Sequence, residues 1–303
     1  MTVAVSEGRL EVDEGLGLYY RVVGDGPRTV VVPSACWLAE DFMPLVKDRR
    51  FVFYDVRGRG RSDSVISRSR LSMENEKSDL KALADHLRLE KFSLFGWSYM
   101  GGVAVLYALK HPGQVEHIVQ IGPVPARKKL YYDQYMTNLS ARLNPADLAR
   151  LKEMKQEGRD VDDPDGYCRE AWRILAAGMM ARPETFDSTK ADFCHHKNEM
   201  PENVSFHLSQ INESRGDWDW RGSLNRLTTP VLIVHGDKDP IPMDSAEEWA
   251  AYLPEARLLA VHRAGHFPWL EQPEVFYPAV DGFLDGAWPD KAERFQLEKG
   301  GAS

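Results

Sequence analysis

Short, mostly apolar runs alternate with longer segments of helical periodicity over most of the chain. The runs, rich in β-branched and aromatic residues, lie at residues 29–32, 51–54, 92–95, 115–121, 231–235 and 257–261. Continuous apolar runs of this length are typical of strands that are buried on both faces of a parallel sheet. Helices are predicted between and after them, at residues 39–47, 73–89, 244–252 and 273–284.

The start of the chain follows a different pattern, because apolar and polar residues alternate there. Residues 9–13 and 18–23 read as two strands of an antiparallel hairpin, and the Gly-Asp-Gly-Pro turn at 24–27 ends the second strand. Together with the repeated strand–helix order that follows, the hairpin predicts an α/β fold. We expect a mostly parallel, eight-stranded sheet with helices on both faces.

The alternation stops between residues 124 and 215, where no strand pattern occurs. Prolines separate four predicted helices in this segment, at residues 130–143, 145–156, 166–180 and 204–214. The pattern predicts an inserted helical cap of residues 124–215. The α/β core would then consist of residues 1–123 and 216–303.

Charge and composition exclude several classes of function. The 303 residues carry a net charge of −8 without a basic stripe, which argues against nucleic-acid binding. No run reaches the roughly 20 apolar residues that a membrane helix needs. The N-terminus lacks a basic stretch followed by an apolar block, so a cytoplasmic protein is expected.

The three cysteines, Cys36, Cys168 and Cys194, are widely spaced and odd in number. This favours free thiols in a reducing compartment over a disulfide framework. A metal site is not expected either, because Cys194 is followed directly by His195 and His196, and adjacent side chains on a helix point apart. No cofactor motif was identified.

Residues 91–112 contain the clearest chemical signal. An apolar strand pattern breaks at Gly96, and a helical pattern restarts at about Tyr99, with Ser98 between them. A sharp strand–serine–helix turn is typical of a nucleophile elbow, which exposes the hydroxyl above the sheet. The following helix N-terminus offers free N–H groups to a developing negative charge.

A serine nucleophile needs a base and a carboxylate that orients it, and two later strand ends supply both. The sequence PVLIVHGDKDPIP places Asp237 and Asp239 after one buried strand, and VHRAGHFPWLEQPE places His266 after the next. The order serine, acid, histidine is that of α/β-hydrolases and differs from the order in other serine triads.

These motifs, with the loop YDVRGRGRSD at residues 54–63, resemble a capped α/β-hydrolase of the proline-iminopeptidase and epoxide-hydrolase-like branch. The resemblance covers residues 9–285. It implies that Ser98 is the nucleophile, Asp239 the acid and His266 the base. Asp239 is favoured because the family's acid is the second carboxylate of G-D-x-D, which leaves Asp237 to order the loop.

The resemblance also implies an oxyanion hole made by the backbone N–H groups of Tyr99 and Ala35. The chain departs from the family at two positions, since Pro33-Ser34 replaces the usual His-Gly and Met100 replaces the second elbow glycine. Substrate-pocket residues are expected next to the catalytic loops, and the candidates are Cys36, Trp37, Trp97, Met100 and Trp269.

The predicted function is that of a serine hydrolase that cleaves a small carboxylic ester through an acyl-enzyme on Ser98. One alternative is an aminopeptidase of the proline-iminopeptidase kind, which needs cap carboxylates to hold a free amine. The candidates are Glu170, Glu199, Glu202 and Glu213. A second alternative is a ligand receptor that keeps the triad without turnover. The expected partner is a small-molecule substrate, and the oligomeric state is left open.

Overall fold

A computed structural model of the protein describes residues 4–13 and 15–296. It contains an eight-stranded sheet in the order β1-β2-β4-β3-β5-β6-β7-β8. The first strand pairs, β1 with β2 and β2 with β4, are antiparallel, whereas β3–β4, β6–β7 and β7–β8 are parallel. The predicted α/β fold with a mostly parallel sheet of eight strands is therefore confirmed.

Residue contacts divide the chain into two compact parts. Among the described residues, the N-terminal part consists of residues up to 92 and residues 139–216, and the C-terminal part of residues 93–138 and 217–296. Two of the three boundaries fall inside a strand, β5 (Phe92–Trp97), and inside a helix, α4 (Tyr132–Arg142). The division into a core and a cap at residues 123 and 215 stays a prediction.

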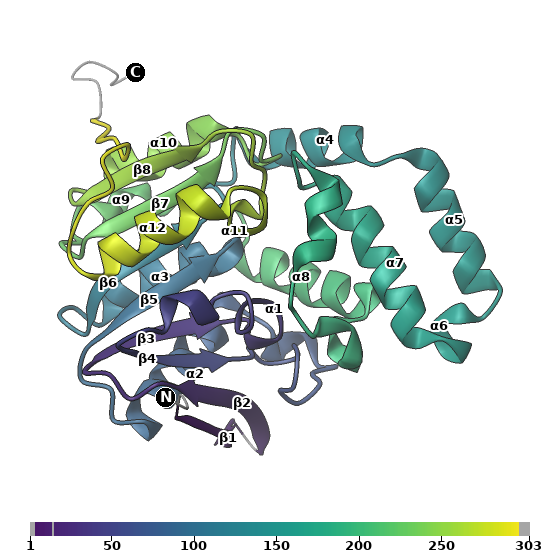
Figure 1. Ribbon diagram of the computed structural model, residues 1–303, viewed down its shortest axis with the longest axis horizontal. Helices are drawn as coiled ribbons and strands as arrows, with labels where there is room; N and C mark the ends of the chain where they lie inside the picture. The colour runs from purple at the N-terminus through teal and green to yellow at the C-terminus, as the bar shows by residue number, and fades with distance from the viewer. Residues whose placement is uncertain (1–3, 14, 297–303) are drawn as a thin grey trace. The chain divides into compact units, whose positions relative to one another are not determined.

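The N-terminal part begins with the predicted hairpin, whose strands pair from Val5 with Val23 to Val12 with Leu16. Its strands, shown in purple in Figure 1, are β1 (Val5–Val12), β2 (Leu16–Val23), β3 (Arg28–Pro33) and β4 (Arg49–Tyr54). Helix α2 (Met73–His86) follows, and its N-cap Ser72 accepts a hydrogen bond from the Asn75 backbone N–H.

The predicted helix at residues 39–47 is wrong. A four-residue helix, α1 (Ala35–Leu38), forms earlier, and only Met43–Leu45 in the predicted range makes a 3₁₀ turn. The reason is local, because Ser34 adopts a left-handed conformation with φ 64° and turns the chain into a helix directly after Pro33. Helical periodicity alone does not reveal such a turn.

Helices make up the rest of the N-terminal part, and no residue between 139 and 216, all of which are described, is in a strand. The α-helices, shown in teal to green in Figure 1, are α5 (Pro145–Gln156), α6 (Arg159–Asp162), α7 (Pro164–Ala177) and α8 (Pro201–Arg215). Proline occupies the first position of α5, α7 and α8, where its missing N–H costs nothing. Three 3₁₀ turns, η3 (Pro183–Ser188), η4 (Phe193–His195) and η5 (Lys197–Glu199), link α7 to α8.

Cys168 on α7 and Cys194 on η4 form a disulfide, so the expectation of free thiols is wrong for these two residues. They are 26 residues apart in sequence, but packing of α7 against η4 brings their Cα atoms to 5.6 Å, within the usual range for a disulfide. Cys36 is a free, buried thiol. The disulfide removes the cysteine-based argument for a reducing compartment.

The disulfide is expected to stabilise the helical segment by lowering the conformational entropy of the unfolded chain. A bridge across 26 residues corresponds to about 3.5 kcal/mol in the loop-entropy account. The variant Cys168→Ser/Cys194→Ser should therefore unfold at a lower urea concentration than the oxidised wild type. Reductant should shift the wild type in the same direction and leave the double variant unchanged. Equal midpoints for the oxidised wild type, the reduced wild type and the double variant would contradict the bridge.

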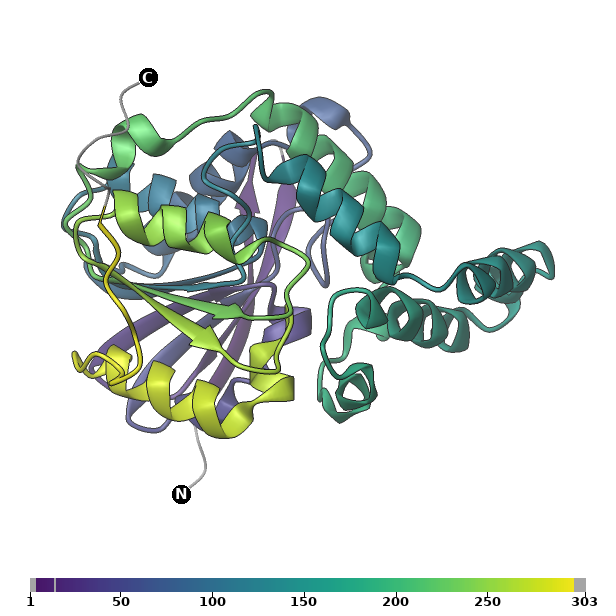
Figure 2. The same ribbon diagram turned by 90° about the horizontal axis from the view of Figure 1, so that it is seen from above.

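The C-terminal part contains the remaining strands, β6 (Val115–Ile121), β7 (Val231–Gly236) and β8 (Ala256–Val261), besides most of β5. Its further helices are α3 (Tyr99–Lys110), α9 (Arg221–Leu224), α10 (Met243–Tyr252), α11 (Pro268–Glu271) and α12 (Pro273–Leu284). Both α10 and α12 contact β7, and they lie on opposite faces of the strands (Figure 2). Loops at the carboxyl ends of β5, β7 and β8 carry the residues of interest.

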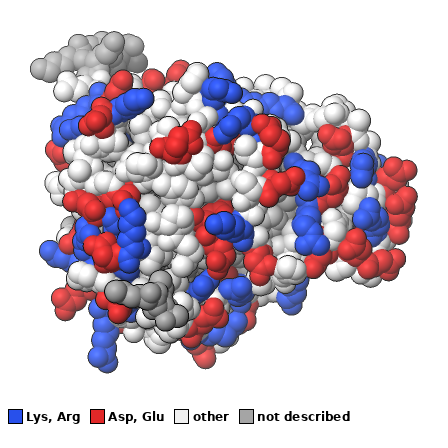
Figure 3. Space-filling model, in the orientation of Figure 1, with Lys and Arg blue, Asp and Glu red and all other residues white. Residues whose placement is uncertain are grey.

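Acidic and basic side chains are interspersed on the face drawn in Figure 3, and no extended basic area is visible among the residues coloured there. The full chain carries a net charge of −8. Within the described residues, no helix combines the length and apolar character needed to cross a membrane.

Candidate active site

Ser98 lies at the junction between β5 and α3, where the chain turns sharply. Its backbone adopts φ 56° and ψ −126°, a conformation that is unfavourable for a residue with a side chain. Neighbouring backbone holds this conformation, because the Ser98 N–H donates to the Ile121 carbonyl at 2.9 Å and its own carbonyl accepts from Gly101 at 3.0 Å. The predicted strand–serine–helix turn is thus present in the structure.

Glycines on both sides of Ser98 permit the turn. A Cβ atom on Gly96 would lie 2.4 Å from the Met100 carbonyl oxygen, and one on Gly101 would lie 2.9 Å from Cβ of Pro123. Close approach of backbone at position 96 and of the Pro123 ring at position 101 therefore requires glycine at both positions. Met100, which replaces the family's second elbow glycine, is buried in the same turn. A contribution of Met100 to a substrate pocket stays a prediction.

Asp239 and His266 come together from two different loops. Asp239 follows β7 and His266 follows β8, and Nδ1 of His266 lies 2.8 Å from Oδ2 of Asp239. The side chains of both residues are at most 1% exposed. The second carboxylate oxygen of Asp239 accepts the Ile241 backbone N–H at 2.9 Å, which fixes the carboxylate plane.

The electrostatic environment keeps Asp239 ionised. Burial alone would raise the pKa of Asp239, but attraction to His266 and its hydrogen bond lower it. The buried His235 and the Ile241 N–H act in the same direction, so that the pKa of Asp239 lies below its ordinary value. An ionised, buried carboxylate next to an imidazole is suited to stabilise an imidazolium.

Two further carboxylates hold the loop that carries His266. Asp237 accepts the Arg263 backbone N–H at 2.8 Å and lies 2.7 Å from Nδ1 of His262. Glu271, which is fully buried, accepts the Gly265 N–H at 2.6 Å. These bonds confirm the interpretation of Asp237 as a loop-ordering residue, and Glu271 orders the same loop.

Aromatic rings surround the His266 loop. The indole N–H of Trp97 donates to the His266 carbonyl at 3.1 Å, and its ring lies 5.2 Å from that of Trp269 and 5.2 Å from that of Phe267. Trp269 is buried, whereas Trp97 is only partly buried. The packing role is established by these contacts, while a role of Trp97 and Trp269 in a substrate pocket stays a prediction.

The predicted nucleophile and base do not hydrogen-bond to each other in this structure. Nε2 of His266 is buried and has no partner among the described residues. Catalytic hydrogen bonds are often long before substrate binds and tighten in the complex. Nε2 of His266 is therefore open to accept a proton from a group that arrives beside it.

Two residues near the acid–base pair were missed by the sequence analysis. His235, at the end of β7, is fully buried, and its Nε2 lies 3.0 Å from the Ile241 carbonyl oxygen. Gly122, directly after β6, has φ 48°, and a Cβ atom there would lie 2.7 Å from Nδ1 of His266 and 2.9 Å from Oδ2 of Asp239. For Gly122, the only signal in the sequence was its position as a glycine directly after a predicted strand.

Gly122→Ala is expected to lower catalytic activity at least tenfold. The added methyl group would displace the hydrogen-bonded atoms of His266 and Asp239, and positive φ itself costs about 1–2 kcal/mol in alanine. Steady-state kinetics with any accepted substrate would measure the effect. Gly113→Ala is a suitable control, since its φ of 83° is also positive but its Cβ would meet nothing within 4 Å. Equal activities of the two variants would contradict the prediction.

Ala35, Cys36 and Trp37 all lie on α1 in the N-terminal part and are buried. The backbone N–H of Ala35 has no hydrogen-bond acceptor among the described residues, which is uncommon for a buried amide. The Cys36 N–H donates to Oδ1 of Asp55 at 2.8 Å. Burial raises the pKa of the Cys36 thiol well above its usual range, so that this thiol is a poor nucleophile.

Comparison with known proteins agrees with this geometry. Residues 35–273 match the family described as alpha/beta hydrolase fold. A 2-hydroxy-6-oxononadienedioate/2-hydroxy-6-oxononatrienedioate hydrolase from Pseudomonas putida is 26% identical, over 92% of this chain and 94% of its own. A proline iminopeptidase from Saccharolobus solfataricus is 24% identical over 94% of each chain. The solved structure of an esterase from Exiguobacterium antarcticum has a TM-score of 0.66 at 20% identity, covering 91% of this chain and 98% of its own.

The fold and the loops at the strand ends define an α/β-hydrolase. The family match extends over more than half of the chain, and the chain belongs to the alpha/beta hydrolase family. The two curated relatives carry the names of different hydrolases, so that they support a hydrolase activity without giving its substrate, and the solved esterase structure supports the fold.

Proposed function

We propose that the protein is a serine hydrolase that cleaves a small carboxylic ester, with Ser98, Asp239 and His266 as its triad. The observation that carries the proposal is the buried hydrogen bond of 2.8 Å between His266 and Asp239, which leaves Nε2 of His266 open. Ser98 at a strained turn between strand and helix supplies a matching nucleophile. The His266–Asp239 arrangement is that of a base with its orienting acid.

In the proposed reaction, Nε2 of His266 takes the hydroxyl proton of Ser98 while the oxygen attacks the ester carbonyl carbon. The tetrahedral intermediate collapses when His266 returns this proton to the leaving alcohol, and an acyl-enzyme remains. Water then attacks the acyl group with His266 as base, which releases the carboxylic acid and restores Ser98. Asp239 keeps the imidazole oriented and stabilises its positive charge.

Backbone N–H groups would stabilise the negative charge on the intermediate. Tyr99 opens α3 directly after Ser98, in the position that the predicted first donor requires. Ala35 opens α1 with an N–H that has no acceptor among the described residues, as the predicted second donor requires. Both assignments belong to this proposal.

The aminopeptidase alternative needs a carboxylate that is available for a substrate amine, and the structure weakens it. Glu199 is paired with Arg59, Glu170 with Arg173, and Glu202 with Lys155. Glu213, the fourth candidate, lies on α8 and is exposed. Three of the four carboxylates thus already neutralise a cation, so ester hydrolysis remains the favoured function.

A substrate panel on the purified full-length chain tests the proposal. It should contain short p-nitrophenyl esters, a lactone, a proline amide and a 2-hydroxy-6-oxodienedioate, the compound class in the name of one relative. We expect turnover of the short esters and covalent labelling of Ser98 by a fluorophosphonate probe, located by peptide mass spectrometry.

The alternatives give different results in the same panel. Release of proline without ester turnover would replace the proposal by the aminopeptidase. Cleavage confined to the 2-hydroxy-6-oxodienedioate would indicate that the bond cleaved is a carbon–carbon bond and not an ester. Labelling of Ser98 without turnover of any compound would favour the ligand receptor. Absence of labelling would contradict Ser98 as the nucleophile.

A further inference from the structure

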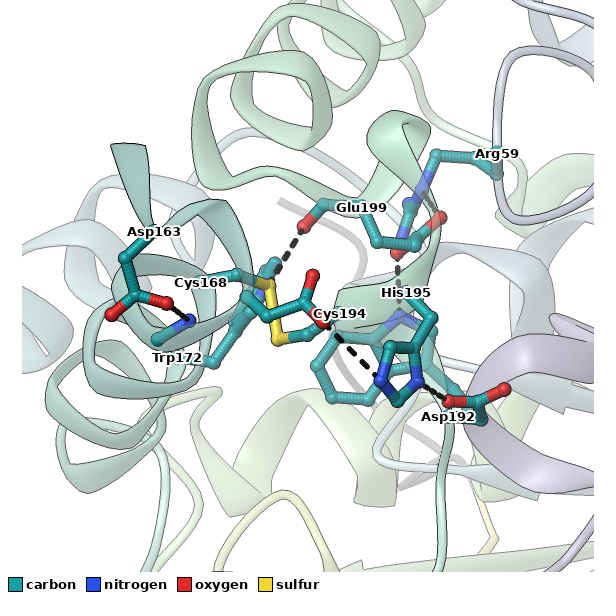
Figure 4. Close-up of a disulfide and its surroundings, with 11 residues drawn as sticks. Arg59, Asp163, Cys168, Trp172, Asp192, Cys194, His195 and Glu199 are labelled. Atoms are coloured by element: carbon teal, nitrogen blue, oxygen red, sulfur yellow. Dashed lines mark hydrogen bonds and ion pairs between the residues drawn. A yellow bond between two sulfur atoms is a disulfide. The ribbon is translucent and has the colours of Figure 1, made fainter. Parts of the chain in front are cut away.

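Glu199, on η5 in the N-terminal part, has a fully buried side chain whose two oxygens accept four hydrogen bonds. Arg59 donates through Nε at 2.8 Å and Nη2 at 2.7 Å, and the Gly60 backbone N–H donates at 2.7 Å. The indole N–H of Trp37 donates at 2.6 Å. Figure 4 shows the Glu199 side chain directed toward Arg59, beside the disulfide. These four bonds use the full acceptor capacity of a carboxylate.

The charge and hydrogen bonds around Glu199 keep it ionised despite its burial. Burial alone would raise its pKa, but the positive charge and hydrogen bonds of Arg59 outweigh this effect and lower the pKa of Glu199. A buried pair of this kind is weak evidence for stability, because desolvation offsets much of the attraction. The contacts that Glu199 makes with α1 and with the loop after β4 therefore need a different explanation.

One of the four donors, Trp37, belongs to α1, two residues after Ala35. Its ring stacks on Phe193 with centroids 4.1 Å apart and meets Trp172 edge-on at 4.8 Å. The indole N–H of Trp172 donates to the Glu199 carbonyl at 2.8 Å. Glu199 and the aromatic residues around it thus hold the side chain of the α1 residue two positions after the unpartnered Ala35 N–H.

A second anchor reaches α1 from the loop after β4. Asp55 accepts the Cys36 N–H at 2.8 Å and the Arg61 N–H at 3.0 Å. A Cβ atom on Gly60 would lie 2.3 Å from the Asp55 carboxylate, so this loop packs directly on Asp55. Glu199 binds Arg59 and Gly60 in the same loop, and therefore acts on α1 both directly through Trp37 and through the residues that contact Asp55.

We propose that Glu199 is a positioning residue that fixes the orientation of the Ala35 backbone N–H as an oxyanion donor. A helix of four residues has too few internal hydrogen bonds to hold its own first turn, so α1 depends on contacts from outside. An oxyanion donor accelerates the reaction only if it is held in place before the charge develops. This inference rests on the proposed function, because it gives Ala35 a role in the hydrolysis.

The test compares Glu199→Gln and Trp37→Phe with wild type in ester hydrolysis. Glu199→Gln keeps the shape of the side chain but removes its charge, and Trp37→Phe keeps an aromatic ring on Phe193 but removes the N–H donor. We expect kcat to fall about tenfold or more in both, below the 10²–10³-fold cost of removing an oxyanion donor outright. KM should stay within about threefold. The affinity for a boronic acid, whose adduct places an oxygen in the oxyanion hole, should fall by the same factor as kcat.

Asp79→Asn serves as the matched control for loss of stability alone. Asp79 is a buried carboxylate in the same part of the chain and pairs with Arg57 at 2.7 Å. It has no hydrogen bond to α1 among the contacts described. This variant should lose stability in urea unfolding and keep the wild-type kcat and boronic acid affinity.

Each outcome has a distinct meaning. If wild type turns over esters and both Glu199→Gln and Trp37→Phe keep full kcat, this inference is overturned while the proposed function stands. A raised KM with unchanged kcat in Trp37→Phe would place Trp37 in the substrate pocket and also overturn it. If Glu199→Gln does not fold, Trp37→Phe decides by the same measurements. A wild type without ester turnover would overturn the proposed function and this inference with it.

Discussion

Ser98→Ala is expected to reduce kcat for ester hydrolysis by about four orders of magnitude or more. The hydroxyl oxygen is the proposed attacking atom, and alanine offers no atom that could form the acyl-enzyme. The remaining rate would come from substrate binding and oxyanion stabilisation, through which water could attack directly. Steady-state kinetics with the best substrate of the panel, together with loss of fluorophosphonate labelling, would measure the effect.

The substitution should leave the fold intact. Alanine at position 98 keeps the backbone N–H that bonds to Ile121 and the carbonyl that bonds to Gly101, and it bears the same positive φ as serine. Ser93→Ala is a matched control, because Ser93 lies in β5, the strand that leads to Ser98, and its hydroxyl lies 3.4 Å from Nδ1 of His117. Ser93→Ala should keep the wild-type rate. A Ser98→Ala variant with more than about one tenth of that rate would contradict a nucleophilic Ser98.

Local patterns in the sequence were sufficient to predict those features that depend on neighbouring residues in the chain. The apolar runs predicted the strands because burial on both faces leaves no polar alternation. The loops with Asp239 and His266 were placed correctly at strand ends, and the structure brings these two side chains to 2.8 Å. Ser98 could be recognised because a strand, a glycine and a helix surround it within a few residues.

Contacts between distant segments could not be predicted from these patterns. The Cys168–Cys194 disulfide depends on how α7 packs against η4, and an odd number of cysteines pointed away from it. Glu199 looked like one of four equivalent carboxylates until its bonds to Arg59 and Trp37, 140 and 162 positions away in sequence, were visible. Gly122 gave no signal of its contact with His266, since that contact joins the ends of β6 and β8.

The pair Asp237 and Asp239 allows the assignment of the acid to be tested within one loop. Asp239→Asn is expected to lower kcat by about three to four orders of magnitude at neutral pH, with little change in KM. An asparagine amide can donate to Nδ1 of His266, which would place the imidazole proton on Nε2. In that tautomer His266 cannot accept the Ser98 proton, and no carboxylate remains to stabilise the imidazolium.

Asp237→Asn is the control, because Asp237 lies two residues away and bonds to Arg263 and His262 instead of His266. Its amide oxygen can still accept the Arg263 N–H, and His262 is a largely exposed partner. We therefore expect a kcat within about threefold of wild type, since an exposed pair contributes at most about 1 kcal/mol. A large loss of kcat in Asp237→Asn together with a small loss in Asp239→Asn would reverse the assignment. In that case Asp237 would orient the His266 loop for catalysis, and the 2.8 Å bond between Asp239 and His266 would only support the fold.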